Sequence, residues 1–288
     1  MIVAVLTTIA GAEVKKKTIK SINTPQQPQQ QLQAANVAAT DFDNAVNAYY
    51  YDDLNTAMTY INKHLKAHPN DALGWTCQAA IYSDGDNDDE ALKALDKANK
   101  CKIDQSDPSL LHWMYFTQSS VYLQTKDYQS AINVLNKAVE CDPTDVDTYM
   151  RLGNTYKRLK EYDLAMVNYG LAVQYNPKEV EGYLGLGTVA GSLKKRKDAI
   201  KAYTMAIKLE PDVAESYALR AVEYYNDWDY KNSVKDVISA LERDQENARA
   251  LWVLDNLKQN EDAAKDLQKE FNNIAKKSKD NSWLKYIE

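Results

Sequence analysis

Histidine and cysteine are scarce in this 288-residue sequence, which contains three of each. It has no catalytic-nucleophile motif, no phosphate-binding loop and no cluster with the spacing of zinc ligands. His64 and His68 are four residues apart, but no H-E-x-x-H motif and no third ligand accompany them. We therefore predict a non-enzymatic protein with no cofactor and no metal site, in which the histidines are packing and surface residues.

Long apolar runs and an excess of positive charge are also absent. No apolar stretch is long enough to cross a bilayer, so we predict no integral membrane span. The net charge is −6, which gives no general attraction to the phosphates of nucleic acid. Nucleic acid is therefore not an expected partner.

The N-terminus resembles part of a secretory signal. Residues 2–12 read IVAVLTTIAGA, an apolar region that ends in a small-residue cleavage motif, although the usual basic segment before it is missing. We interpret residues 1–12 as a truncated signal peptide and expect a bacterial protein exported to the periplasm; a cytoplasmic protein with a loose hydrophobic tail is the alternative. Residues 13–36 are rich in lysine, glutamine and proline, which predicts a disordered linker.

Small residues recur along the rest of the chain, mostly at intervals of 34 residues with one interval of 40. One such column consists of Ala57, Ala91, Ala131, Ala165, Ala199 and Ser233. A second follows seven residues behind it and consists of Ala98, Ala138, Ala172, Ala206 and Ala240. Proline closes four of the units, at Pro69, Pro143, Pro177 and Pro211. Three columns with one period predict a repeated helical unit that ends at proline.

Aromatic residues form a further column upstream of the small ones. Tyr149, Gly153 and Tyr156 are spaced i, i+4 and i+7, which places them on one face of a helix. The same spacing recurs in neighbouring units, for example at Tyr115 and Ser119. Small residues let two helices approach closely while the aromatic rings fill the space beside them. Each unit is therefore expected to be a closely packed pair of helices.

This pattern resembles the tetratricopeptide repeat, a helix-turn-helix unit of about 34 residues. The match is closest over 146–179, where Tyr149, Leu152, Gly153, Tyr156, Ala165, Tyr169, Ala172 and Pro177 fill the family positions. Six repeats are assigned within residues 37–247, at 38–71, 72–105, 112–145, 146–179, 180–213 and 214–247. The resemblance implies an all-α fold, a right-handed superhelical solenoid of helix-turn-helix repeats.

Two segments depart from the regular repeat. Residues 106–111 lengthen one interval, and Asp107 followed by Pro108 predicts a longer first helix for the third repeat. Residues 248–288 are interpreted as a degenerate seventh helix pair that caps the solenoid. Their last eight residues, NSWLKYIE, begin an apolar face that nothing completes, so either this tail folds back onto the cap or the chain continues in a longer protein.

The three cysteines fit the repeat as packing residues. Cys101 and Cys141 occupy one repeat position, at which the next repeats have Tyr175 and Leu209. We therefore interpret Cys77, Cys101 and Cys141 as small core hydrophobes, not as a disulfide framework.

The resemblance further implies that the first helix of each repeat lines a concave groove in which peptides bind. The groove positions of the family correspond here to Phe42, Tyr49, Tyr50, Trp113, Phe116, Met150, Asn154, Lys157, Arg158, Tyr225 and Asn226. Some members hold chaperone tails with a clamp of lysine, asparagine and arginine, but Met150, Gly185 and Leu219 replace residues of that clamp. The expected partner is therefore a protein or peptide of another kind.

Two alternatives remain beside this protein-interaction scaffold. The solenoid could be the substrate-selecting or regulatory arm of an enzyme whose catalytic region lies in a missing C-terminal part or in a partner. Self-association through the ends of the solenoid is the other.

Overall fold

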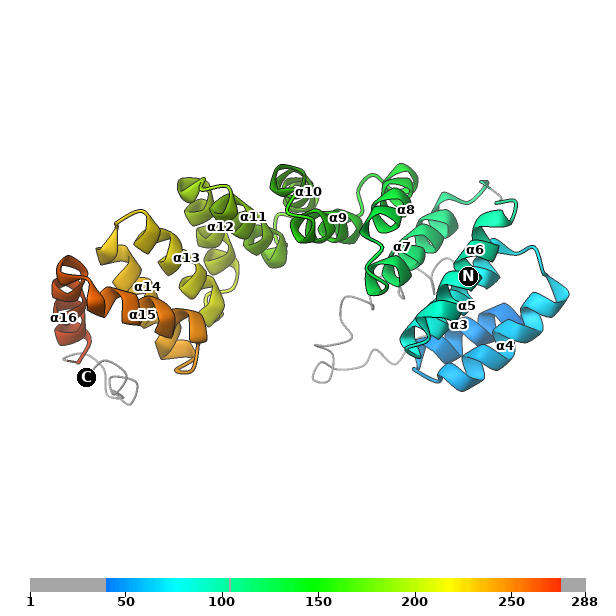
Figure 1. Cartoon of the computed structure of the whole chain (residues 1–288), viewed down its shortest axis with the longest axis horizontal. Coiled ribbons are helices and arrows are strands. Elements are labelled where there is room, and N and C mark those ends of the chain that lie inside the picture. The colour runs from blue at the N-terminus through cyan, green and yellow to red at the C-terminus, as the bar shows by residue number, and fades with distance from the viewer. Residues whose placement is uncertain (1–39, 104, 276–288) are drawn as a thin grey trace. The chain divides into compact units, whose positions relative to one another are not determined.

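The computed structural model describes residues 40–103 and 105–275, and these form fourteen α-helices joined by short turns (Figure 1). Neither of these ranges contains a β-strand. The helices are α3 (Asp41–Tyr50), α4 (Leu54–Ala67), α5 (Ala72–Asp84), α6 (Asp88–Lys100), α7 (Pro108–Gln124), α8 (Tyr128–Cys141), α9 (Val146–Arg158), α10 (Tyr162–Tyr175), α11 (Val180–Ser192), α12 (Arg196–Leu209), α13 (Ala214–Asn226), α14 (Tyr230–Arg243), α15 (Ala248–Gln259) and α16 (Glu261–Ala275). The predicted all-α solenoid of helix-turn-helix repeats is confirmed.

Several predictions fall on other parts of the chain. The signal peptide assigned to residues 1–12, the linker assigned to 13–36 and the tail NSWLKYIE lie outside the described residues. Among the helices that the structure does describe, none combines the length and the apolar character that crossing a membrane requires.

The small-residue columns lie in second helices, the first column in all of the first six pairs and the second column in the last five of these. The first column contains Ala57, Ala91, Ala131, Ala165, Ala199 and Ser233, and every one of these residues is fully buried. The second column, Ala98, Ala138, Ala172, Ala206 and Ala240, is fully buried as well. A larger side chain at these positions would hold the paired helices apart, so the period in the sequence records where two helices touch.

The turns inside these six pairs share a left-handed residue. Positive φ angles, between 57° and 65°, occur at Asp52, Asp86, Lys126, Lys160, Lys194 and Trp228. The second helix starts just beyond, and Asp127 and Asp229 cap such starts by accepting the backbone N–H of Ser130 and Asn232. Left-handed backbone costs an L-residue about 1–2 kcal/mol, so each turn is held by the pairing of its two helices.

The longer first helix predicted for the third repeat is confirmed. α7 has 17 residues and starts at Pro108. The carboxylate of Asp107 accepts the backbone N–H groups of Ser109 and Leu110, and thereby satisfies two donors that the first turn leaves free.

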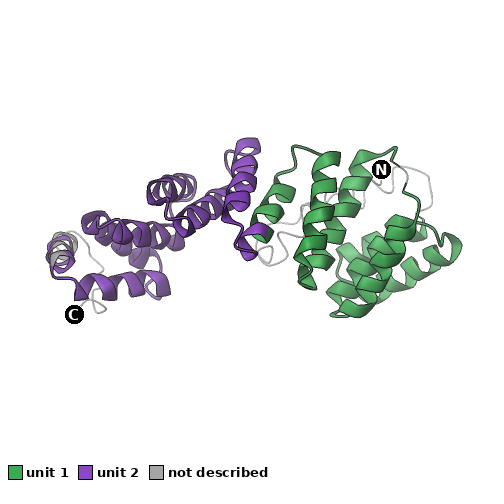
Figure 2. Cartoon of the chain, turned by 45° about the horizontal axis from the view of Figure 1, so that its top comes forward, with its two compact units in different colours: residues 1–155 green, residues 156–288 purple. Residues whose placement is uncertain are grey.

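The chain divides into two compact units, unit 1 (residues 1–155) and unit 2 (residues 156–288), with α9 spanning the boundary (Figure 2). In unit 1, α3, α4, α5 and α7 enclose a core that includes Ile61, Ile81 and Met114. In unit 2, α13, α14, α15 and α16 enclose another, with Val237 and Leu254 near its centre. Each unit therefore has its own hydrophobic core.

The cysteines agree with the packing interpretation to different degrees. Cys77 is buried, and burial, with a smaller contribution from Asp71, raises the pKa of its thiol to about 12. Cys101 and Cys141 are half-buried, and all three thiols are free. Because a thiolate is the reactive form, the high pKa makes Cys77 an unreactive core residue.

Candidate functional site

The residues assigned to the groove divide between the two units. Phe42, Tyr49, Tyr50, Trp113, Phe116, Met150 and Asn154 belong to unit 1, whereas Lys157, Arg158, Tyr225 and Asn226 belong to unit 2. Five of the seven in unit 1 are buried, namely Phe42, Tyr49, Trp113, Phe116 and Met150. Trp113 and Phe116 are the most deeply buried of these, with only 3% and 1% of their surface exposed. A bound segment cannot reach these two rings without displacing the packing of unit 1.

Trp113 packs in the core that α3, α4, α5 and α7 enclose, where α5 and α7 approach each other closely. Gln118 donates to Thr76 Oγ1 at 3.1 Å, and Gln124 donates to the backbone carbonyl of Ser83 at 2.6 Å. These bonds hold the two first helices together, and Trp113 lies in the core that both helices line. Sequence register alone does not report this spacing, because it depends on residues that are about 40 positions apart.

Phe116 is enclosed by polar groups that are themselves fixed. The ring of His112 stacks on it with centroids 5.8 Å apart, and the guanidinium carbon of Arg151 lies 3.8 Å from its centroid. Burial would raise the pKa of Asp145, but hydrogen bonds from His112 and Thr148 outweigh it, so the pKa lies below its ordinary range. His112 is thus a packing residue, and an alanine at position 116 would open the core.

The other predicted residues around α9 and α3 are more accessible. Tyr50 is half-exposed at the end of α3, where its ring lies 5.2 Å from that of Tyr51. Asn154 and Arg158 are exposed on α9. Lys157 is partly buried, with its Nζ 5.9 Å from the ring centroid of Tyr169, and burial together with Arg158 lowers its pKa. The small basic spot at Lys157 and Arg158 is therefore a surface feature of unit 2.

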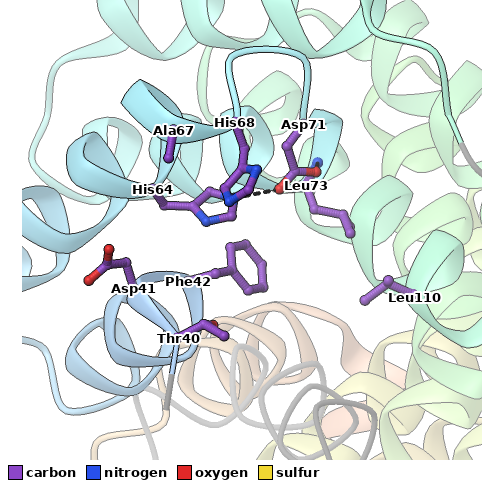
Figure 3. A pocket seen from close by; sticks show the side chains of 9 residues that line it. All are labelled: Thr40, Asp41, Phe42, His64, Ala67, His68, Asp71, Leu73 and Leu110. Atoms are coloured by element: carbon purple, nitrogen blue, oxygen red, sulfur yellow. Dashed lines mark hydrogen bonds and ion pairs between the residues drawn. The ribbon is translucent and has the colours of Figure 1, made fainter. Parts of the chain in front are cut away.

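A cavity of about 500 Å³ lies at the start of unit 1 (Figure 3). Its lining comes from the ends of four helices, α3, α4, α5 and α7, and consists of Thr40, Asp41, Phe42, His64, Ala67, His68, Asp71, Leu73 and Leu110. Of the predicted groove residues, Phe42 is the one that faces this space, with its ring 5.3 Å from that of His64.

Several polar groups of this cavity have structural partners. His64 Nε2 lies 2.7 Å from Asp71 Oδ2, and Asp71 also caps α5 by accepting the N–H of Leu73 (Figure 3). Asp41 forms an ion pair with Lys63 at 2.8 Å. Among the described residues, no group of three or more histidine, cysteine or carboxylate side chains is arranged to hold a metal. The cavity offers a mixed polar and apolar surface.

A different surface emerges in unit 2, where four rings meet at the junction of α13, α14 and α15. We call Tyr225, Trp228, Tyr230 and Trp252 the aromatic cluster. The ring centroid of Tyr225 lies 5.7 Å from that of Tyr230 and 6.5 Å from that of Trp252, and Trp228 lies 6.1 Å from Tyr230. Such separations and tilted planes are those of interacting aromatic pairs. The four rings therefore form one continuous surface.

The two tyrosines of the aromatic cluster are held by the core of unit 2, whereas its two tryptophans are exposed. Tyr225 and Tyr230 pack against the core of unit 2, and the Tyr230 hydroxyl accepts a hydrogen bond from Asn260 at 3.0 Å. Trp228 and Trp252 expose 78% and 52% of their surface. Of the predicted groove residues, Tyr225 belongs to this cluster and Asn226 is exposed beside it.

Trp228 and Trp252 are not among the groove residues predicted from the sequence. Trp252 lies three 34-residue periods after Met150, a predicted groove position, so extension of the repeat register into the seventh helix pair would have found it. Trp228 occupies the left-handed turn position, where the five preceding pairs have aspartate or lysine. A large apolar ring at a strained and exposed position contributes little to folding, which makes Trp228 a candidate for contact with another molecule.

Glu223 on α13 is a buried carboxylate in the same unit. The residue is 8% exposed, and a β-carbon built on Gly191 of α11 would lie 2.4 Å from its Oε1. Burial raises the pKa of Glu223, Asp227 adds to this effect and Arg196 opposes it. Within the described residues, no hydrogen bond or ion pair reaches the carboxylate.

The raised pKa predicts how stability changes with pH. The folded state binds the Glu223 proton more tightly than the unfolded state does, so this contribution is complete below the ordinary carboxyl pKa and is lost as pH rises through the folded pKa. We expect E223Q to unfold at a higher temperature than the wild type at pH 7, with the difference shrinking toward pH 4. Thermal unfolding followed by circular dichroism measures this.

The exposed Glu242 on α14 supplies the control, because E242Q removes the same charge from the surface. E242Q should leave the unfolding temperature nearly unchanged. A lower unfolding temperature for E223Q at pH 7 would show that the buried carboxylate has a stabilising partner.

Comparisons with known proteins identify the repeat. One family model, described as TPR repeat, matches residues 120–160, and another, described as Tetratricopeptide repeat, matches 146–179 and 180–213. A search of curated proteins found no match.

Solved structures with the same architecture extend over more of the chain. The C-terminal part of a TPR repeat-containing protein from Cytophaga hutchinsonii has a TM-score of 0.64 at 15% identity, and the alignment covers 86% of this chain and 99% of that one. YrrB, described as a TPR protein with an unusual peptide-binding site, has a TM-score of 0.57 at 20% identity, with 66% and 95% covered. MamA has a TM-score of 0.51 at 23% identity, with 58% and 94% covered. The chain therefore contains tetratricopeptide repeats, and its fold is that of solved tetratricopeptide-repeat proteins.

Proposed function

We propose that this protein is a non-enzymatic scaffold that holds an extended peptide or a helix of a partner protein, and that unit 2 contacts the partner through the aromatic cluster. The observation that carries the proposal is the exposure of Trp228 and Trp252 beside rings that the core holds in place. A few large aromatic side chains provide most of the binding energy in many protein interfaces. Rings that are already positioned lose little conformational entropy when a partner binds.

Two further points support a binding role. Tetratricopeptide repeats build extended surfaces from stacked helices, and YrrB is a solved relative in fold whose description names a peptide-binding site. In addition, Tyr225 and Trp252 fall in columns of the repeat that the family resemblance assigns to ligand contact. These points favour binding by unit 2 over a purely structural role for the exposed rings.

Replacing both exposed tryptophans tests the proposal. We expect W228A/W252A to weaken capture of the partner by at least about 30-fold, since truncation of an aromatic hot spot typically costs 2 kcal/mol or more. Helicity should be unchanged because both rings are mostly exposed. The measurement is affinity capture from a lysate of the source organism with the full chain as bait, followed by mass spectrometry and titration of the captured protein.

The matched control removes apolar surface from a second helix of a pair. Leu164 and Val167 are exposed on α10, so L164A/V167A deletes exposed carbon atoms away from the aromatic cluster. This variant should capture the partner as the wild type does. Equal capture by the wild type and W228A/W252A would contradict the proposal and would place the contact elsewhere on the chain.

A further inference from the structure

Glu223 is an unusual residue to find enclosed by protein. A buried carboxylate is normally paired with a cation or accepts several hydrogen bonds, because transfer of an unpaired charge from water is unfavourable. Glu223 is 8% exposed, and no donor among the described residues forms a hydrogen bond with its carboxylate, whose oxygens keep some contact with solvent. By contrast Asp236, another buried carboxylate of unit 2, accepts two hydrogen bonds from Arg220, at 2.7 and 2.8 Å. Unit 2 thus pairs one carboxylate internally and leaves the hydrogen-bonding positions of the other open to solvent or to a bound group.

The position of the Glu223 carboxylate is set by Gly191. Residue 191 lies one period after Lys157 and one before Tyr225, both predicted groove positions. Gly191 has no side chain, and Glu223 Oε1 lies only 2.4 Å from the position that a β-carbon of residue 191 would occupy. The carboxylate therefore stands where a side chain of this column would stand, although it belongs to the neighbouring first helix, α13.

The surroundings of Glu223 combine negative charge with polar groups. Asn226 and Asp227, both exposed, follow it by three and four residues, the spacing at which side chains are neighbours on a helix. The other charged or titratable groups that act on it electrostatically are Arg196 and Tyr203, both from α12. Arg196 acts on the carboxylate electrostatically but forms no ion pair with it, so the hydrogen-bonding positions of the carboxylate stay open to a group from outside.

We propose that the carboxylate of Glu223, held against Gly191, binds the cationic side chain of an arginine or lysine in the partner segment. This inference rests on the proposed function, because it names the chemistry that unit 2 recognises in its partner. A guanidinium or ammonium group would give the carboxylate the charge-assisted hydrogen bonds that it lacks. The aromatic cluster, which starts two residues further along α13 at Tyr225, would hold apolar parts of the same segment.

A small cationic probe tests this site without knowledge of the partner. The full chain, labelled with ²H and ¹⁵N, is titrated with N-acetyl-arginine methylamide while its backbone amide signals are followed by NMR. We expect saturable shifts at the amides of Gly191, Glu223 and Asn226. In E223Q, which keeps the shape of the side chain and removes its charge, the affinity should fall at least about tenfold.

Two controls fix the interpretation. N-acetyl-norleucine methylamide, an uncharged probe of similar length, should not saturate these amides. G191A places a methyl group where the carboxylate lies and should weaken binding of the cationic probe as E223Q does. Absence of saturable shifts at these amides, equal shifts with the norleucine probe, or unchanged affinity in E223Q would each overturn the inference.

The two experiments distinguish failure of the cation site at Glu223 from failure of the aromatic cluster as the binding surface. If the cationic probe fails while W228A/W252A abolishes partner capture, the aromatic cluster remains the binding surface and the assignment of Glu223 is wrong. If the probe binds in a Glu223-dependent manner while W228A/W252A captures the partner normally, the role of the aromatic cluster is wrong and the cation site stands.

Discussion

Replacement of Arg220 by methionine should destabilise the protein by about 3–5 kcal/mol, the usual cost of removing one partner from a buried ion pair. Arg220 Nε and Nη2 donate to the two carboxylate oxygens of Asp236 at 2.7 and 2.8 Å, and Nη1 donates to Thr204 Oγ1 at 2.9 Å. Both side chains of the pair are largely enclosed. R220M would leave a charged Asp236 in the interior with no cation beside it. Urea unfolding followed by circular dichroism gives the free energy.

The double variant R220M/D236L separates the cost of an orphaned charge from the value of the pair. Apolar replacement of both members of a buried pair is often neutral or stabilising, so much of the loss in R220M should be recovered. A decrease in unfolding free energy of less than about 1 kcal/mol in R220M would mean that water solvates the Asp236 carboxylate, because solvent-exposed ion pairs contribute no more than that. The pair connects α13 to α14, and Thr204 extends it to α12.

Gly187→Ala should destabilise unit 2 by about 1–3 kcal/mol, even though alanine favours helix by about 1 kcal/mol. A β-carbon at this position would lie 2.4 Å from Cε1 and 2.6 Å from Cζ of Tyr203. The Tyr203 ring is enclosed and its hydroxyl lies 3.4 Å from Thr188 Oγ1, so it has little room to move. The same unfolding measurement tests this expectation.

Gly170 provides the matched control for Gly187. Gly170 also lies within a helix, α10. Apart from its sequence neighbours and the backbone of its own helix, no atom lies within 4 Å of the position that a β-carbon would occupy. G170A should therefore gain up to about 1 kcal/mol from helix propensity alone. Equal effects of the two substitutions would show that the contact between Gly187 and Tyr203 does not limit the packing of α11 on α12.

Much of the architecture could be predicted from the sequence. The two small-residue columns lie where paired helices touch, and Asp107 with Pro108 starts α7 as expected. These features depend on residues within one helix or one helix pair, where periodicity and capping chemistry are local. Because the repeat continues with the same period, extending it to the seventh helix pair places Trp252 in a predicted groove column.

The exposure of the predicted groove residues could not be read from the sequence, because it depends on neighbouring helices. Phe116 and Trp252 fall in one groove column, yet Phe116 is covered by the His112 ring and the Arg151 guanidinium while Trp252 is half-exposed on α15. Trp228 lies in a turn, outside every groove column, and its exposure has no periodic signal. The family register gave positions along a helix and carried no information on what covers them.

The sequence by itself determined the helical repeat, its period and the start of its longer third unit, because each follows from spacing within about 34 residues. Only the tertiary structure decided which aromatic rings reach the surface and where the unpaired carboxylate lies. Glu223 meets Gly191 from 32 positions away, across two helices whose separation is set by the summed packing of side chains between them. That separation decides whether a residue in a groove column supports the fold or can contact a partner.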